Sequence, residues 1–178
     1  MDWTEAVLIG LAVAVAVVMA VWVAASRLDR LHRRVDAAWA SLQLQLARRA
    51  SMALDLAHSG VWDPPTSQTV ASVARAALGA APSGQEHSDL SAALRAALDG
   101  ADGIVQRPGD GPQAERVAAL GAAWYRAVLA RRFLNDAVAL TRRLRSRRLV
   151  RLFHLAGGAP MPLACDIDDA PPEALPLR

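Results

Sequence analysis

The chain has 178 residues, a formal net charge of +3, 53% hydrophobic residues and only 4% aromatic residues. Alanine is its commonest residue and the best intrinsic helix former, so the composition favours helices. It disfavours an all-β fold, which needs more β-branched and aromatic side chains. The single cysteine, Cys165, excludes an intrachain disulfide framework, and all 20 basic residues are arginine.

An uncharged apolar run extends from Ala6 to Ala25. As a helix, about 20 residues span about 30 Å, the thickness of the hydrocarbon core of a bilayer. Trp3 and Trp22 lie near the two ends, where indole rings favour the headgroup level. The run therefore predicts a transmembrane helix. A buried helix of a soluble protein and a cleaved signal peptide are the alternatives, but a signal peptide needs a basic N-terminal region, which is absent here.

The charges that flank the run predict its orientation. Four arginines follow it closely, namely Arg27, Arg30, Arg33 and Arg34. By the positive-inside rule they place the C-terminal part in the cytoplasm, and a lone reduced Cys165 is compatible with that compartment. We expect a single-pass plasma-membrane protein. Its predicted parts are an extracytoplasmic N-terminus (1–5), a transmembrane helix (6–25), a cytoplasmic helical bundle (26–156) and an irregular, proline-rich acidic tail (157–178).

Small residues recur every fourth position within the apolar run, at Ala12, Ala16, Ala20 and Ala24. Such spacing lets two transmembrane helices approach closely, and it also arises by chance where Ala and Val nearly alternate. The stripe is therefore either a surface for self-association or a chance result of the composition, and the sequence leaves both interpretations open.

Four helices are predicted after the run. The first, from 28 to 59, carries an apolar stripe at steps of three and four that ends at Gly60 and Pro64-Pro65. The second spans 66–78. The third begins after Ser88, a candidate N-cap, and ends near Gly100. The last begins near Pro112 and continues to about Leu155, where Gly157-Gly158 stop it.

These lengths predict an all-α fold in which the N-terminal transmembrane helix precedes an antiparallel bundle of long helices. The two short helices together match one long column, which favours a three-column bundle. The last helix would then point away from the membrane. A four-helix up-down bundle, the alternative, would bring its end back to the bilayer.

Two local motifs behind the apolar run are similar to those of the LemA family of membrane proteins. The first motif contains Val35, Trp39, Gln45, Leu46, Arg48 and Arg49. The second contains Phe133, Asn135 and Val138. The resemblance implies a membrane-anchored antiparallel helical domain whose biochemical role is poorly defined, and it brings no catalytic residues.

The sequence shows no recognisable catalytic, metal or cofactor motif, so neither enzymatic activity nor a cofactor is expected. The histidines His32, His58, His87 and His154 are far apart and lack the spacing of zinc ligands, so we expect them to be exposed. The tail carboxylates Asp166, Asp168 and Asp169 are interpreted as solvated. Cys165 has no activating partner nearby in the sequence.

Trp39 and Trp124 lie on the apolar stripes of the two long helices, which predicts that both pack in the core. Asn135 is a polar residue in the middle of a helix. It either forms a hydrogen bond across the bundle or is exposed.

The last helix carries a dense arginine cluster: Arg142, Arg143, Arg145, Arg147, Arg148 and Arg151. At about 100° per residue these side chains point all round the helix axis, so this end is expected to project beyond the bundle or to contact an anion. Candidate ligands are anionic lipid headgroups, an acidic protein partner, the chain's own acidic tail and nucleic acid. Nucleic acid is the least favoured, because only Phe133 and Phe153 are near enough to stack on bases. A solvated helix end remains the simplest interpretation.

Two functions are compatible with these features. The first is a non-enzymatic, membrane-anchored helical scaffold that presents a surface to a protein partner. The second is a regulatory or signalling membrane protein that binds an anionic lipid or an acidic partner through the arginine cluster.

Overall fold

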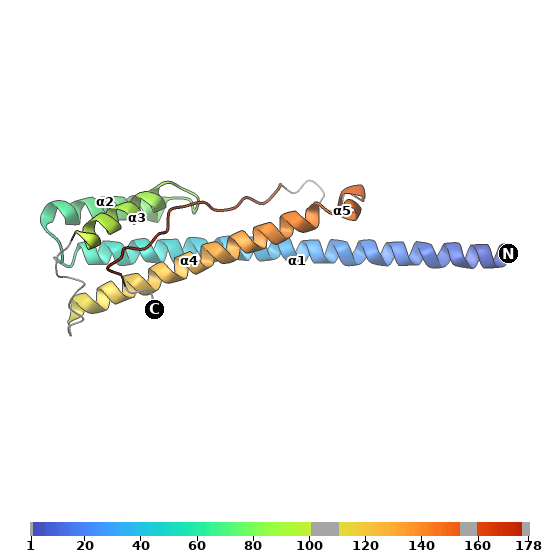
Figure 1. Cartoon of the computed structure of the whole chain (residues 1–178), viewed down its shortest axis with the longest axis horizontal. Coiled ribbons are helices and arrows are strands. Elements are labelled where there is room, and N and C mark those ends of the chain that lie inside the picture. The colour runs from blue at the N-terminus through green and yellow to red at the C-terminus, as the bar shows by residue number, and fades with distance from the viewer. Residues whose placement is uncertain (1, 101–110, 154–159, 176–178) are drawn as a thin grey trace. The chain divides into compact units, whose positions relative to one another are not determined.

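A computed structural model of the chain describes residues 2–100, 111–153 and 160–175 (Figure 1). These residues form helices and irregular segments without any strand, which confirms the predicted all-α class. The helices are α1 (Trp3–Ala57), α2 (Pro64–Gly79), α3 (Glu86–Asp99), α4 (Pro112–Arg145) and α5 (Arg148–Leu152). Residues 160–175 form no helix, as the prolines of the tail predict.

Helix α1 joins the apolar run and the first predicted amphipathic helix into one continuous element. No glycine or proline separates Ala25 from Leu28, so nothing interrupts the backbone hydrogen bonds there. The most apolar stretch of 18 residues in α1 has none of its residues buried, and it is long and apolar enough to cross a membrane. Further along, Leu28, Val35, Leu42 and Leu46 are buried, which confirms the apolar stripe.

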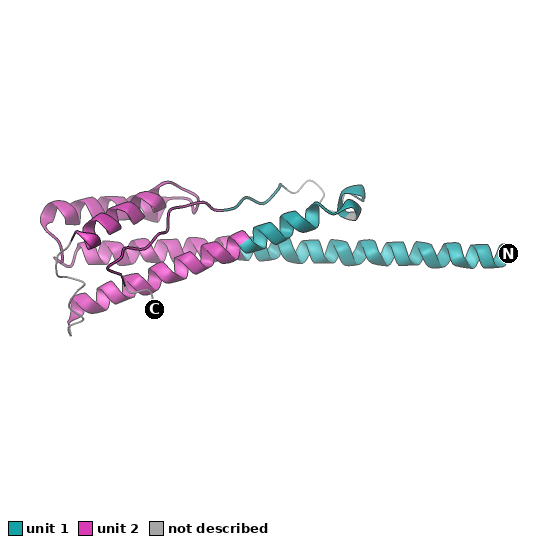
Figure 2. Cartoon of the chain, in the orientation of Figure 1, with its two compact units in different colours: residues 1–37, 136–164 teal, residues 38–135, 165–178 magenta. Residues whose placement is uncertain are grey.

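The chain divides into two compact units (Figure 2). Unit 1 comprises residues 1–37 and 136–164. Unit 2 comprises residues 38–135 and 165–178. Each unit therefore takes one part of α1, one part of α4 and one part of the C-terminal tail.

The core of unit 2 is built mainly from small and medium apolar side chains of four helical segments and the tail, packed with Trp124. It contains Ala50, Ala53, Leu56, Val70, Ala71, Ala74, Ala77, Leu90, Leu94, Leu98, Val117, Leu120, Trp124 and Leu175. Helices α2 and α3 pack along each other as a hairpin. The three-column prediction is therefore wrong for this unit, because the short helices each add a separate face to the core instead of forming one column end to end.

Local chemistry explains where α1 ends and α2 begins. Gly60 adopts a φ of 73°, a left-handed conformation that favours glycine, just after the end of α1. Asp63 caps α2 by accepting a hydrogen bond from the Thr66 N–H at 3.3 Å. Pro64 and Pro65 occupy the first two helical positions, where their missing N–H groups cost nothing, so α2 begins two residues before the predicted start.

Two predicted helix ends are wrong. Helix α3 begins at Glu86 after Gln85, so Ser88 lies inside the helix and is not its N-cap. Helix α4 begins at Pro112 as predicted but stops at Arg145, ten residues before the predicted end. Residues 101–110 and the predicted stop at Gly157-Gly158 lie outside the described residues.

Candidate functional site

The arginine cluster of unit 1 is divided by a break in the helix. The Arg147 N–H donates to the Leu144 carbonyl at 3.1 Å, and the helix resumes as α5 only at Arg148. Leu144 and Val150, on either side of the break, are buried against Leu28 and Leu31 of α1. Two apolar side chains therefore pack this end of the helix against α1. Because the break changes the rotational phase of the helix, one apolar residue on each side is enough to pack this end while arginines surround it.

The six arginines of the cluster have different environments. Arg142 donates to the Pro162 carbonyl at 2.9 Å, and Arg145 donates to the Pro160 carbonyl at 2.8 Å. These two side chains therefore bind backbone carbonyls of the tail. Arg145 is half-buried, and the other five are exposed: Arg142, Arg143, Arg147, Arg148 and Arg151.

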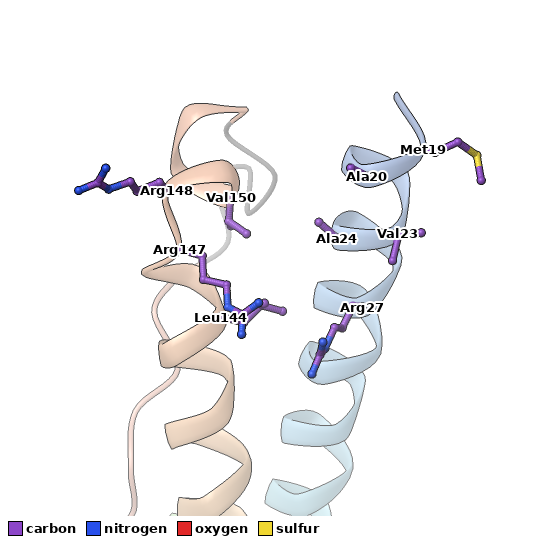
Figure 3. A pocket seen from close by; sticks show the side chains of 9 residues that line it. All are labelled: Met19, Ala20, Val23, Ala24, Arg27, Leu144, Arg147, Arg148 and Val150. Atoms are coloured by element: carbon purple, nitrogen blue, oxygen red, sulfur yellow. The ribbon is translucent and has the colours of Figure 1, made fainter. Parts of the chain in front are cut away.

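A cavity of about 550 Å³ lies between the end of the apolar run and α5 (Figure 3). Its apolar lining consists of Met19, Ala20, Val23, Ala24, Leu144 and Val150. Three arginines complete the lining, and none of the described acidic residues belongs to it. In Figure 3, Arg27 and Arg147 are directed toward the space between the two helices, whereas Arg148 points away from α1. The cavity thus combines an apolar wall with two cations.

In unit 2, the acidic tail forms specific ion pairs. Asp168 pairs with Arg95, whose Nη1 also donates to the Ala170 carbonyl at 2.9 Å. Asp169 accepts two hydrogen bonds from Arg131, at 2.6 Å from Nε and 2.9 Å from Nη2. The interpretation of the tail carboxylates as solvated is therefore wrong for Asp169, which is half-buried. Asp166 and Asp168 are exposed, and Asp168 is ion-paired as well. Hydrogen bonding to Arg95 holds the pKa of Asp168 below its usual value, and the pKa values of Arg95 and Arg131 are correspondingly raised.

The tail backbone is bound by side chains as well. Asn135 donates from Nδ2 to the Cys165 carbonyl at 3.1 Å and accepts from the Cys165 N–H at 2.9 Å. The Trp124 indole donates to the Asp169 carbonyl at 2.9 Å, and the Ser88 hydroxyl accepts from the Asp168 N–H at 3.1 Å. Of the two interpretations of Asn135, hydrogen bonding is correct, but its partner is the tail and not another helix.

We call the side chains that bind the tail in this way the tail cradle, defined as Ser88, Arg95, Trp124, Arg131 and Asn135. Cys165 itself is buried, and its Sγ lies 3.4 Å from the Pro82 carbonyl. Burial raises the pKa of the Cys165 thiol, which disfavours the thiolate.

Beneath the cradle lies a fully buried cation, Arg49. Its Nη1 donates to the Ser91 hydroxyl at 3.1 Å and its Nη2 to the His87 carbonyl at 2.8 Å. Its Cζ lies 4.8 Å from the centre of the Trp124 ring, within the range of a cation–π contact. Burial lowers the pKa of Arg49 to about 10, and the negative charges of Asp169 and Asp168 oppose this shift.

His87 is buried, so the expectation that the histidines are exposed is wrong for this residue. Burial and the nearby Arg49 lower the pKa of His87, which favours the neutral imidazole. His32 is half-buried, His58 is exposed and His154 lies outside the described residues. Within the described ranges, no group of three or more His, Cys, Asp or Glu residues is arranged to hold a metal.

The motif residues fall into two groups. Two motif residues belong to the surroundings of the tail: Asn135 binds Cys165, and Arg49 lies over the ring of Trp124, which binds Asp169. Val35, Leu46 and Val138 are buried apolar residues. The other motif residues do not join a site: Trp39 and Gln45 are half-buried, whereas Arg48 and Phe133 are exposed. Trp124 is fully buried as predicted, but Trp39 is only partly so.

Sequence reasoning missed Ser88, Arg95 and Arg131 as ligands of the tail. Their partners are 38 to 80 residues away in the chain, so no local spacing indicates them. The available signal was the excess of arginine over the few carboxylates of the tail, which does not identify individual pairs.

Comparison of the chain with models of protein families, with curated proteins and with solved structures gives no match.

Proposed function

We propose that this chain is a single-pass, non-enzymatic membrane protein that binds an anionic phospholipid beside its transmembrane helix. The proposal includes a cytoplasmic domain built as an antiparallel bundle, similar to the LemA family. Its support is the unburied apolar stretch in α1, with Arg27 immediately after it. Arginines at this position favour the cytoplasmic face.

The cavity of unit 1 is the observation that carries the lipid assignment. Met19, Ala20, Val23 and Ala24 belong to the apolar run, so an acyl chain of the surrounding leaflet would lie against the same wall. Arg27 and Arg147 would then meet the phosphate at the level where the hydrocarbon ends. Because no carboxylate of the described part of the chain lines the cavity, a bound anion meets no like charge from it there.

A scaffold role for a protein partner is compatible with this assignment, because lipid binding fixes the position of the domain at the membrane surface. Self-association through the alanine stripe remains a separate proposal. Ala20 and Ala24 line the cavity, so only Ala12 and Ala16 of the stripe are clear of it. Nucleic acid remains the least favoured partner.

The membrane anchor is tested by fractionation and by reporter fusions at both ends of the chain. We expect the full chain to resist alkaline extraction from membranes and a reporter fused after Arg178 to be active only in the cytoplasm. Replacing Val15 by arginine should reduce insertion, since an arginine at the centre of a span costs about 2.5–3.5 kcal/mol. A soluble wild-type chain, or a C-terminal reporter active outside the cytoplasm, would contradict this topology.

The lipid assignment is tested with the full chain in phosphatidylcholine vesicles that contain spin-labelled phosphatidylglycerol. We expect the wild type to prefer this anionic lipid over spin-labelled phosphatidylcholine by at least about fivefold, because each arginine near the surface contributes about 1 kcal/mol. The double substitution Arg27→Gln and Arg147→Gln should abolish the preference. The matched control, Arg143→Gln with Arg151→Gln, removes the same charge from exposed positions outside the cavity. An equal loss in both variants would indicate diffuse attraction and would refute a specific site.

A further inference from the structure

We propose that the tail cradle of unit 2 is a recognition site for an extended acidic segment of a partner protein. When no partner is bound, the chain's own residues 165–170 occupy the cradle. This inference is independent of the lipid assignment, because it rests on different residues in the other unit.

The contacts of the cradle are those of a peptide-binding site. The tail segment has no regular secondary structure, and side chains bind its main chain at Cys165, Asp168, Asp169 and Ala170. Asn135 supplies both a donor and an acceptor to the same residue, as a neighbouring β-strand would. Main-chain contacts of this kind accept any extended segment whose side chains fit.

The charges of the cradle determine which segments fit. Arg95 and Arg131 each meet one carboxylate, and the buried Arg49 adds a third cation without an ion pair among the described residues. Among the described residues, Asp99 near Arg95 is the carboxylate outside the tail that acts on these cations, so the cradle without its occupant has a positive excess. Because Arg49 is desolvated, its field is weakly screened and favours a negatively charged occupant. A neutral or basic segment would leave these cations uncompensated.

Burial of alternate residues adds a second requirement. Cys165 and Ile167 are buried, whereas Asp166 between them is exposed. The occupant must therefore present a small residue, then any residue, then an aliphatic residue, followed by two acidic residues. The partner segment that fits has this pattern in an extended conformation.

The contacts that hold the tail are of a kind that can exchange. The side chains of Arg95 and Asp168 are 27% and 44% exposed, and ion pairs at such exposure contribute little to stability. A partner segment would replace the same main-chain hydrogen bonds that the tail makes. The partner segment competes with the tail, whose effective concentration is high because it belongs to the same chain. A partner segment with more acidic residues than the tail would bind the cradle more tightly.

The experiment uses the full-length chain and the reactivity of Cys165, its only cysteine. A synthetic peptide copies residues 163–172 with the substitution Cys165→Ser, so that it cannot react with maleimide itself. Displacement of the tail exposes Cys165, and we expect saturating peptide to raise its rate of maleimide labelling at least fivefold. A control peptide with Asp168→Asn and Asp169→Asn should leave the rate unchanged.

A second arm measures binding directly, by the fluorescence anisotropy of the labelled peptide. The full chain with Asp168→Asn and Asp169→Asn has a weakened tail, and we expect it to bind the peptide about tenfold more tightly than the wild type. Adding Arg131→Gln to this variant should remove the gain, while helicity measured by circular dichroism stays unchanged. If a variant loses helicity, the test of the proposal is the maleimide labelling of the wild-type chain with the acidic and the neutral peptide.

Three results would overturn the proposal. In the first, saturating peptide neither changes the labelling of the wild type nor binds the variant. In the second, the neutral peptide acts as well as the acidic one. In the third, light scattering shows a dimer that the peptide dissociates, which would assign the cradle to the tail of a second copy of this chain and not to a partner protein.

Discussion

Replacing Trp124 by alanine should lower the free energy of unfolding by about 3–5 kcal/mol, the largest loss that we expect from one substitution. Trp124 is fully buried in the core of unit 2, and alanine leaves a large cavity there. The substitution also removes the indole N–H bonded to the Asp169 carbonyl and the aromatic face beside Arg49. Urea denaturation followed by circular dichroism measures this change.

Two controls separate the contributions of Trp124. Trp39→Ala removes a half-buried indole and should cost about 1 kcal/mol. Trp124→Phe keeps most of the packing but loses the hydrogen bond to the tail. It should cost about 1 kcal/mol and raise the maleimide reactivity of Cys165. Equal losses for Trp39→Ala and Trp124→Ala would contradict the central position of Trp124 in the core.

Replacing Arg49 by methionine should raise the free energy of unfolding by about 1 kcal/mol, whereas Arg49→Ala should lower it by about 2–4 kcal/mol. Methionine keeps most of the side-chain volume and removes a buried charge, whereas alanine leaves a cavity. The His87 carbonyl left behind remains satisfied, because the Ser91 hydroxyl donates to it at 3.0 Å. Urea denaturation measures both changes in the free energy of unfolding, provided that the m value is the same in the variants and the wild type.

The pH dependence of this difference has a definite sign. Burial lowers the pKa of Arg49 to about 10 in the folded chain, below its usual value in the unfolded chain. Between these values the unfolded chain binds more protons than the folded chain, so the stability of the wild type rises with pH relative to Arg49→Met. The advantage of methionine should therefore shrink above pH 10. A methionine variant less stable than the wild type at neutral pH would show that the contacts of Arg49 outweigh its desolvation.

If the cradle binds acidic segments, Arg49→Met should also weaken that binding, since it removes the buried positive charge beneath the site. A gain in stability with a loss of recognition is the pattern expected of a residue retained for function. Conversely, unchanged peptide affinity in this variant would restrict recognition to Arg95 and Arg131.

Much of the secondary structure could be predicted because its causes are local. The apolar stripe from Leu28 to Ala53 follows the helical period, and Gly60 and the two prolines interrupt the chain where α1 gives way to α2. The end of α4 could not be predicted in this way. No glycine or proline marks Arg145, and the helix stops where Leu144 and Val150 both reach the same apolar contact with α1.

The sequence by itself determined the helical class, the approximate position of each long helix and the apolar run in α1, because each depends on residues within a few turns of one another. Only the tertiary structure decided which arginines are structural and which line a cavity. Arg49, Arg95 and Arg131 look like any other arginine in the sequence, yet one is buried and two bind the tail. A buried or paired charge depends on partners brought from distant parts of the chain, and their contribution exists only after folding has removed water from around them.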